Sequence, residues 1–383
     1  MFKAAGQASV PNFVLNKSLE ELRMLKKAAA LLLVCASMGT WLGCGTTSSR
    51  FLYAAIPGGA GGGQIVAYRE DPNAGVLAQL AGSPITAGSA VESLALHPSG
   101  KYLYAANSGS NNISLYTISS TGGLTEVTPR TAAGTSPTLL VMDASGSFLY
   151  VANSGSFDIS VFSIATDGTL TEVQQTNGAT APIGLSAINM ALAPSGNFLY
   201  VTGQGVQGWI EVFPLNQGVV GTPVAGSPFL TGDNPYGLVI DSTGSRLYTA
   251  NKQDNTISEF TINSDGSLGT VSGSPIGETY TGPVSLLIDK SGKYLYVANQ
   301  GSSNLAAYSI GSDGGLTLLT NSPFATGAEP SFIAADSSGK YLFVGNQTSP
   351  AIQSFSLDTS SGALTSVGSY SVPATPTSIV ITP

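Results

Sequence analysis

The sequence predicts an all-β protein in which one four-stranded unit is repeated seven times around a ring. Three observations support this fold class. Every unit contains a short segment of similar sequence, here called the central phrase, and a further aromatic residue follows it. The 47 Gly and 21 Pro residues supply turns for many short strands. The central phrase itself contains Leu-Tyr or a close variant, and its aromatic residues recur every 46 to 51 residues, at Tyr53, Tyr104, Tyr150, Tyr200, Tyr248, Tyr296 and Phe343. Four strands in a repeat of about 40–50 residues are typical of a blade, so the pattern predicts a seven-bladed β-propeller.

Each unit is predicted to contain four antiparallel strands in a fixed order. An apolar strand such as 237–241 ends in a Ser/Thr-Gly turn. The Leu-Tyr strand follows and stops at Asn, a residue that tolerates left-handed turn geometry. A third strand alternates apolar and polar residues, as in 159–164. A turn such as Asp265-Gly266 then leads to a short fourth strand, often closed by Gly-Ser-Pro.

The two ends of the repeat region predict how the ring closes. The first unit starts directly at Phe51 and lacks an innermost strand, whereas residues 376–383 match an inner strand and nothing else. We therefore expect the C-terminal strand to complete the first blade, which removes the exposed edges that an open sheet presents. The propeller is expected to span residues 51–383.

The first 43 residues are predicted to be a leader. Lys26 and Lys27 form a short basic region, and a mostly apolar run follows at 28–42. The segment Leu42-Gly43-Cys44 resembles the lipobox of bacterial lipoproteins, which implies lipidation of Cys44. Residues 24–43 then form the signal peptide, 1–23 an extension upstream of a start at Met24, and 44–50 a short linker. Cleavage elsewhere and a short anchor helix are the alternatives. We expect an exported protein, held to a membrane only by this anchor and facing the periplasm or the cell exterior.

Composition excludes several classes of partner. Five of the 14 Lys and Arg residues lie in the leader, and so do two of the 22 Asp and Glu residues. The remaining nine cations and 20 anions cannot form the basic surface that nucleic acid requires. His97 is the only His, and two Cys are too few for a disulfide framework or a Cys-based zinc site. These counts predict no metal site, and we expect no cofactor and a monomer. We interpret His97 as a residue of the turn between the first two strands, on the face opposite the loops that usually form a propeller's site, because it aligns with Asp143, Ala193, Asp241, Asp289 and Asp336 of the other units.

The repeat resembles the lactonase-type seven-bladed propeller family and related Tyr-Val-Thr-Asn-repeat surface proteins. The matching segments are 98–107, 145–155 and 293–301. The resemblance implies the opening of sugar or aromatic-acid lactones at a central site that combines His, Glu and Arg. The family's Arg follows the Asn of the repeated phrase, where this chain has Ser108, Ser154, Gln204, Lys252, Gln300 and Gln347. The family's His corresponds to Glu92, Thr138, Ile188, Tyr236, Val284, Ser331 and Thr377.

These departures favour a binding or scaffold module for an unknown small molecule, glycan or protein. The alternative is a lactone hydrolase with a divergent site, related to 6-phosphogluconolactonases, in which Glu92 is the one candidate for a general base. An exposed Trp209 is expected to stack on a sugar ring. The predicted ligand-binding residues break the repeat at the loops around the central funnel, and they are Glu92, Trp209, Tyr236, Lys252, Glu278 and Tyr280.

Overall fold

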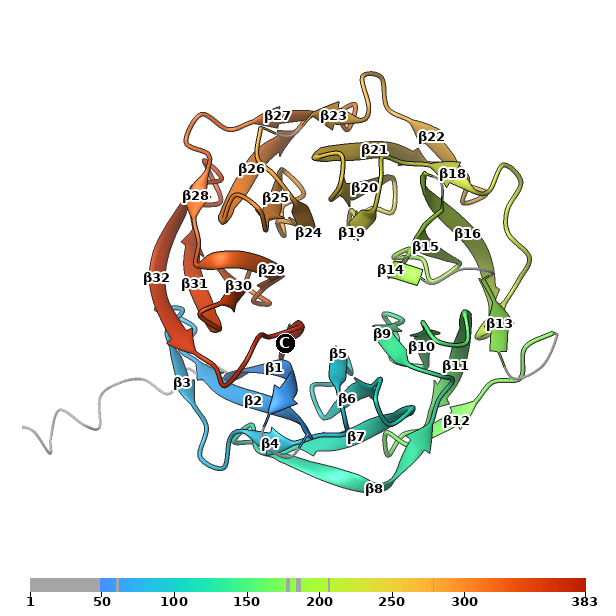
Figure 1. Ribbon diagram of the computed structural model, residues 1–383, viewed down its shortest axis with the longest axis vertical. Coiled ribbons are helices and arrows are strands. Elements are labelled where there is room, and N and C mark those ends of the chain that lie inside the picture. Colours follow the sequence, from blue (N-terminus) through green and yellow to red (C-terminus); the bar gives the residue numbers. More distant parts are fainter. Residues whose placement is uncertain (1–48, 60–61, 177–179, 184–186, 206, 278) are drawn as a thin grey trace, which may run out of the picture. The chain divides into compact units, whose positions relative to one another are not determined.

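The computed structural model describes residues 49–383 except 60–61, 177–179, 184–186, 206 and 278. Seven antiparallel sheets are arranged around a central axis, each with its strands stepping outward from the axis (Figure 1). The described residues contain strands and turns but no helix, so none of them forms a helix long and apolar enough to cross a membrane. The seven-bladed, all-β prediction is confirmed.

Each blade runs from an innermost strand at the axis to its outermost strand at the rim. Blade 1 contains β33 (Ser378–Ile381), β1 (Arg50–Gly59), β2 (Gly62–Glu70), β3 (Leu77–Gln79) and β4 (Ile85–Thr86). Blade 2 contains β5 (Val91–Leu96), β6 (Tyr102–Asn107), β7 (Asn112–Ile118) and β8 (Leu124–Ala132). Blade 3 contains β9 (Pro137–Met142), β10 (Phe148–Asn153), β11 (Asp158–Ile164), β12 (Leu170–Glu172) and β13 (Thr180–Pro182).

The remaining blades follow the same order. Blade 4 contains β14 (Ala187–Leu192), β15 (Phe198–Gln204), β16 (Gly208–Asn216), β17 (Val219–Val220) and β18 (Phe229–Leu230). Blade 5 contains β19 (Pro235–Ile240), β20 (Arg246–Asn251), β21 (Thr256–Ile262), β22 (Leu268–Thr270) and β23 (Ile276–Gly277). Blade 6 contains β24 (Pro283–Ile288), β25 (Tyr294–Asn299), β26 (Asn304–Ile310), β27 (Leu316–Leu318) and β28 (Phe324–Ala325). Blade 7 contains β29 (Ala328–Ala335), β30 (Tyr341–Thr348), β31 (Ala351–Leu357) and β32 (Leu364–Ser371).

The ring closes through the C-terminal strand, as the sequence predicts. β33 lies beside β1 (Figure 1), and the two pair in antiparallel register from Leu52↔Ile381 to Ala55↔Ser378. A reciprocal pair of contacts continues the ladder beyond the strand, because the Phe51 amide donates to Thr382 Oγ1 at 2.8 Å and the Thr382 amide donates to the Phe51 carbonyl at 2.9 Å.

In five blades, the outermost strand is divided into two short pieces that pair with the same third strand. In blade 5, for example, β22 and β23 both pair with β21. Ser274-Pro275 lies between these pieces, and proline has no backbone N–H to donate to the ladder. The Ser274 hydroxyl instead accepts the Glu259 amide of β21 at 2.7 Å.

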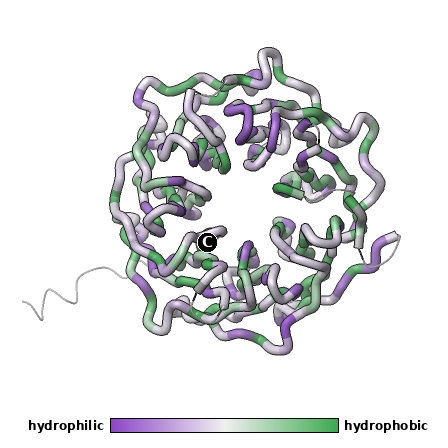
Figure 2. Tube along the Cα trace, viewed as in Figure 1, coloured by the Kyte–Doolittle hydropathy of each residue, from purple (hydrophilic) through white to green (hydrophobic). Residues whose placement is uncertain are grey.

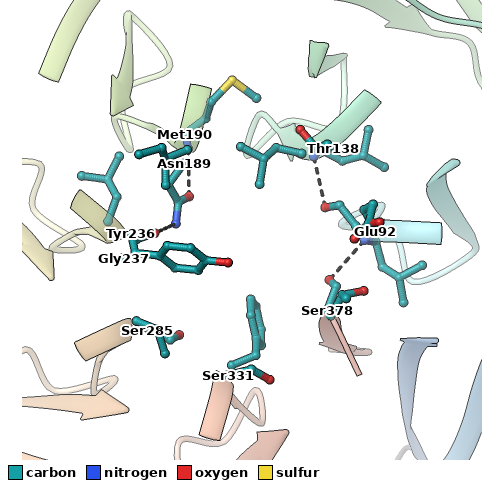
Figure 3. A pocket seen from close by; sticks show the side chains of 18 of the residues that line it. Glu92, Thr138, Asn189, Met190, Tyr236, Gly237, Ser285, Ser331 and Ser378 are labelled. Carbon is teal, nitrogen blue, oxygen red and sulfur yellow. Dashed lines mark hydrogen bonds between the residues drawn. The ribbon is translucent and has the colours of Figure 1, made fainter. Parts of the chain in front are cut away.

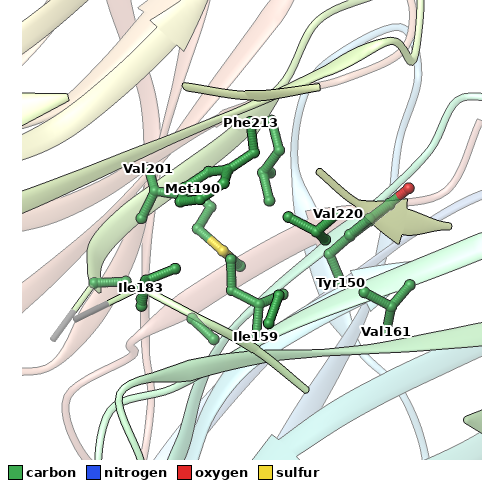
Figure 4. Packing of buried hydrophobic residues seen from close by; sticks show 12 residues of the cluster. Tyr150, Ile159, Val161, Ile183, Met190, Val201, Phe213 and Val220 are labelled. Carbon is green, nitrogen blue, oxygen red and sulfur yellow. The ribbon is translucent and has the colours of Figure 1, made fainter. Parts of the chain in front are cut away.

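The hydrophobic core lies between the blades. Seven clusters of buried apolar residues each join residues of two neighbouring blades. Figure 4 shows the cluster between blades 3 and 4, where Ile159 and Val161 face Val201 and Phe213. Apolar segments accordingly occur in every blade around the ring (Figure 2). Each blade therefore depends on both neighbours for the burial of its two faces.

A repeated hydrogen bond explains why the central phrase uses Tyr more than Phe. The hydroxyl of a buried Tyr donates across the seam to a glycine carbonyl in the outer turn of the next blade. This interblade bond occurs in the pairs Tyr53–Gly122, Tyr104–Gly168, Tyr200–Gly266, Tyr248–Gly314 and Tyr296–Gly362, at 2.7–3.1 Å. The glycines have φ near +70 to +90°, the left-handed region that the Asp-Gly turns predict.

The Asn at the end of the Leu-Tyr strand serves a different purpose from the one predicted. Asn107 does not have a positive φ; the left-handed residue is Asn111, four positions later. The Asn107 side chain is fully buried, where it donates to Asn112 Oδ1 and Ser114 Oγ and accepts the Gly88 amide at 3.1 Å. Asn is therefore required for side-chain hydrogen bonds that tie the inner hairpin to the preceding loop.

Candidate functional site

A cavity of about 640 Å³ lies on the axis of the ring, where the inner strands of all seven blades converge (Figure 3). The sequence repeat places one equivalent residue per blade at the start of each inner strand. All seven equivalent residues line the cavity, and they are Glu92, Thr138, Ile188, Tyr236, Val284, Ser331 and Thr377. We call this cavity the central funnel. Its size is within the usual range of small-molecule sites, about 300–1,000 Å³.

Glu92 is the one carboxylate among the described residues that line the central funnel. It lies near the start of β5 and is half-buried. Burial raises the pKa of the Glu92 carboxyl, and a hydrogen bond from the Ser108 hydroxyl, at 3.4 Å, opposes this shift. A raised pKa makes the ionised carboxylate a stronger base, which suits it to accept a proton from water.

Tyr236 lies on the opposite side of the funnel, and its ring projects across the opening toward Glu92 (Figure 3). The side chain is 44 % exposed, which is unusual for an aromatic residue of this chain. Asn189 of the neighbouring blade holds the Tyr236 backbone, because its Nδ2 donates to the Tyr236 carbonyl at 2.9 Å. The Oδ1 atom of the same Asn189 side chain accepts a hydrogen bond from the Met190 backbone N–H at 2.8 Å. The Tyr236 hydroxyl is thus presented on a fixed backbone, free to meet a ligand.

Near the start of the inner strands, the rest of the funnel wall contains both polar and apolar residues. Gln300 and Gln347 join blades 6 and 7 through a 2.9 Å amide contact, and Ser331 donates to two backbone carbonyls. Two residues further along the inner strands the lining is apolar, with Leu94, Leu140, Met190, Leu238, Leu286 and Ile333. No Lys, Arg or His occurs among the described residues of the lining, so the wall favours uncharged ligands over anions.

Of the predicted ligand-binding residues, Glu92 and Tyr236 line the funnel together, and the others lie elsewhere. Lys252 is adjacent, with Nζ 5.0 Å from the Tyr236 ring centroid, a cation–π contact at the rim. Tyr280 packs against the core between blades 5 and 6. Glu278 and Cys44 lie outside the described residues.

The expectation of an exposed Trp209 is wrong. The side chain is only 8 % exposed, because its indole packs where Gly203 has no Cβ; a Cβ there would lie 2.1 Å from the ring. Of the aromatic residues predicted to bind a ligand, Tyr236 is the one that lines the funnel. Trp209 and Tyr236 both depart from the repeat. The sequence alone does not distinguish an aromatic side chain that packs over a glycine from one that faces a channel.

His97 is placed as the sequence predicts, in the turn between β5 and β6 and outside the funnel lining. Its Nδ1 lies 2.7 Å from Ser99 Oγ and its Nε2 lies 3.2 Å from the Gly146 carbonyl, so it joins the turns of blades 2 and 3. Within the described part of the chain, no cluster of three or more His, Cys, Asp or Glu side chains is arranged to hold a metal ion.

The sequence reasoning missed Asn189, Gln300 and Gln347 as parts of the site. Gln300 and Gln347 follow the Asn of the repeated phrase, so the position was recognised, but the residues were considered only as replacements for an Arg. Asn189 stands one residue after an equivalent position, where the other blades have Ser, Leu, Gly or Phe. Comparing the seven repeats at the position directly after each equivalent residue would have identified Asn189.

The fold is a seven-bladed propeller with a cavity of small-molecule size on its axis. The chain belongs to the lactonase family of seven-bladed β-propellers, whose family model matches residues 85–185 and 276–381. The comparison with curated proteins found no match.

Solved structures share the whole fold at low identity. A Bacteroides fragilis protein provisionally assigned as a 6-phosphogluconolactonase superimposes with a TM-score of 0.75 at 21 % identity, over 88 % of this chain and 99 % of that one. The periplasmic gluconolactonase PpgL of Pseudomonas aeruginosa superimposes with a TM-score of 0.70 at 20 % identity, over 88 % and 99 % of the two chains.

Proposed function

We propose that this protein hydrolyses an uncharged lactone in the central funnel, with Glu92 as the general base. The observation that carries the proposal is the position of Glu92, a half-buried carboxylate with a raised pKa that faces the funnel of a lactonase-family propeller. Family membership supports this alternative over the expectation of a module that only binds.

The chemistry needs two groups from the funnel. Glu92 takes a proton from a water molecule, whose oxygen forms a bond to the lactone carbonyl carbon. The Tyr236 hydroxyl, which projects into the same space, donates a hydrogen bond to the carbonyl oxygen as negative charge develops there. The ring C–O bond then breaks, and the departing alkoxide takes the proton back from Glu92. The product is an open hydroxy acid, and Glu92 returns to its starting state.

The charge of the funnel selects the substrate. A phosphorylated sugar lactone carries a dianion, which requires Arg or Lys in hydrogen-bonding reach. The described lining contains one anion and no cation, and Lys252 lies at the rim above Tyr236. An uncharged lactone, with hydroxyls for Gln300, Gln347 and Ser331, is therefore the substrate class that we propose.

We expect Glu92→Gln to lower kcat/KM for unphosphorylated five- and six-membered aldonolactones by about 10²–10⁴-fold, the usual contribution of a general base. Wild-type turnover is expected to fall as the pH is lowered through the raised pKa of Glu92, since only the ionised form accepts a proton. The measurement is release of acid, followed in a weakly buffered pH-indicator assay across a lactone panel. Glu126→Gln, on outer strand β8, is the matched control and should leave the rate unchanged.

Phosphorylated lactones should be turned over more slowly than their uncharged counterparts. Equal rates for Glu92→Gln and wild type would remove Glu92 from the mechanism. Saturable binding of the uncharged lactones without any turnover would support the second candidate, a binding module. The absence of a cation from the described lining favours this candidate, because no positively charged side chain is present there to stabilise the negative charge that develops on the carbonyl oxygen.

We further propose that the protein is exported and lipid-anchored through Cys44. The support is the basic and apolar leader followed by Leu42-Gly43-Cys44 in the sequence. In the native host, Cys44→Ser is expected to move the protein from the detergent phase to the aqueous phase, or to leave the leader uncleaved. Mass spectrometry of the wild-type N-terminus tests this directly, and a mature chain without an acyl group on Cys44 contradicts it.

A further inference from the structure

One interblade hydrogen bond of the ring is missing. Five of the six buried tyrosines of the repeated phrase donate to a glycine carbonyl of the next blade. The sixth, Tyr150, has the equivalent glycine, Gly218, within blade 4, but that carbonyl accepts Gln175 Nε2 at 3.2 Å instead. Gln175 also accepts the Val220 amide through Oε1 at 2.8 Å. Among the described residues the Tyr150 hydroxyl therefore has no hydrogen-bond partner, although the side chain is only 2 % exposed.

A second cavity opens beside this unpartnered hydroxyl. It has a volume of about 340 Å³, lies between blades 3 and 4, and is lined by residues of both inner turns and of the outer turn at Gly218. Tyr150 and Phe148 form part of its wall. We call it the seam cavity. It shares no lining residue with the central funnel.

In some seams a side chain packs onto the turn glycine of the next blade, and in the seam between blades 3 and 4, as at Gly292 of blade 6, no side chain does so. Between blades 2 and 3, His97 packs onto Gly146, so that a Cβ on that glycine would lie 2.5 Å from Nε2. Between blades 6 and 7, Lys290 packs onto Gly339 in the same way. The corresponding turn glycine of blade 4 is Gly196, and a Cβ there would meet nothing within 4 Å.

The lining combines an apolar surface with hydrogen-bonding groups around it. Phe148, Pro194 and Leu215 supply the apolar surface, and Asp143, Ser195 and Gln217 supply polar groups. Asp143 Oδ1 accepts the Phe148 amide at 2.6 Å and Oδ2 accepts the Ser145 hydroxyl, so each oxygen retains a free lone pair. No cation lines the cavity among the described residues, which disfavours an anionic ligand.

We propose that the seam cavity is a second binding site, for one neutral, hydroxyl-rich ring of monosaccharide size. Such a ring has an apolar face for Phe148 and Pro194 and hydroxyls that can donate to Asp143 and bond with the Tyr150 hydroxyl. The site is separate from the central funnel and does not depend on lactone hydrolysis. Its partner is a free monosaccharide or a single sugar unit of a glycan.

The test is a titration of the protein with D-glucose, D-galactose, D-mannose and N-acetyl-D-glucosamine at millimolar concentrations. The readout is the NMR signal of ¹³C-labelled Tyr rings, with Tyr150 assigned through Tyr150→Phe. We expect a saturable shift of the Tyr150 signal with at least one sugar. Because Tyr150→Phe lacks this signal, the affinities of wild type and variants are compared through saturation transfer from the protein to the sugar protons. Tyr150→Phe should weaken binding by about five- to tenfold, the loss of one hydrogen bond. Ser195→Trp, at an exposed lining position, should abolish binding.

Tyr104→Phe is the matched control, because its hydroxyl bonds the Gly168 carbonyl at 2.7 Å. We expect this variant to melt at a lower temperature yet to bind the sugar as wild type does, whereas Tyr150→Phe should retain its melting temperature and its lactone turnover. The proposal is overturned if no sugar shifts the Tyr150 signal, or if Tyr150→Phe binds as tightly as wild type. A shift produced by a cationic amine such as choline, and by no neutral sugar, overturns the ligand class.

Discussion

Removal of residues 373–383 is expected to abolish cooperative folding of the propeller. The truncated chain loses β33, which pairs with β1 at four positions, and it loses both contacts between Phe51 and Thr382. Ser378 and Ile379 also leave the seams on either side of blade 1, where Ser378 Oγ accepts the Leu94 amide and Ile379 is 2 % exposed. At about 1 kcal/mol for each hydrogen bond and about 2 kcal/mol for a buried Ile, several kcal/mol are lost. A domain has only about 5–15 kcal/mol to lose.

The measurement is thermal and urea unfolding, followed by circular dichroism and by Tyr fluorescence. A synthetic peptide of residues 373–383 added to the truncated chain should restore a cooperative transition, because blade 1 then regains its inner strand. Thr382→Val provides a graded comparison, since it removes the Oγ1 contact to Phe51 and leaves β33 in place. A truncated protein that melts as the full chain does would show that the closing strand contributes nothing to the ring.

Glu70→Gln is expected to stabilise the protein at alkaline pH. Glu70 ends β2 with 1 % of its surface exposed, and neither carboxylate oxygen has a hydrogen-bond partner. Arg50 Nη1 lies 3.7 Å from Glu70 Oε1, but it is closer to Asp336 Oδ2, at 2.7 Å, and forms its ion pair there. Burial first, and then the negative charge of Asp336, raise the pKa of Glu70 from its ordinary value of 4.5 to about 7, while Arg50 opposes the shift.

The direction of the pH effect follows from linkage. The folded state holds the proton of Glu70 more tightly than the unfolded state does, so folding takes up a proton between pH 4.5 and about 7. Stability therefore falls as the pH rises through this window. At pH 8 the ionised Glu70 carries its full cost, on the order of 3 kcal/mol for a shift of this size. A neutral Gln at this position avoids that cost.

We expect the free energy of unfolding of wild type to decline between pH 5 and pH 8 more steeply than that of Glu70→Gln. The two proteins should be close in stability near pH 5, where Glu70 is protonated, and separate as the pH rises. Other buried carboxyls, including Glu259, have raised pKa values and contribute equally to both curves. The difference between the curves is thus the measurement. Parallel curves would mean that Glu70 does not change its charge in this range.

The sequence alone determined the order of the strands in each blade, but it did not predict that the outermost strand is divided into two pieces in five blades. The period of 46 to 51 residues, the alternation within the third strands and the terminal inner strand predict the seven blades and their closure. The sequence shows these features because successive residues of a strand face opposite neighbouring blades. The packing therefore repeats with the same period as the sequence. The same repeat identified the seven positions that surround the funnel, including Glu92 and Tyr236.

The tertiary structure decided the properties that depend on which side chains meet, within a blade, across a seam or across the axis. Trp209 and Tyr236 are both aromatic exceptions to the repeat, but one fills the gap at Gly203 and the other faces the funnel. Glu70, Arg50 and Asp336 form a buried cluster only because ring closure joins residues 286 positions apart. Tyr150 obeys the repeat in full, yet Gln175 of its own blade takes the carbonyl that its equivalents bond. A repeat defines where a side chain points, whereas the partner it meets depends on the residues that the fold places beside it.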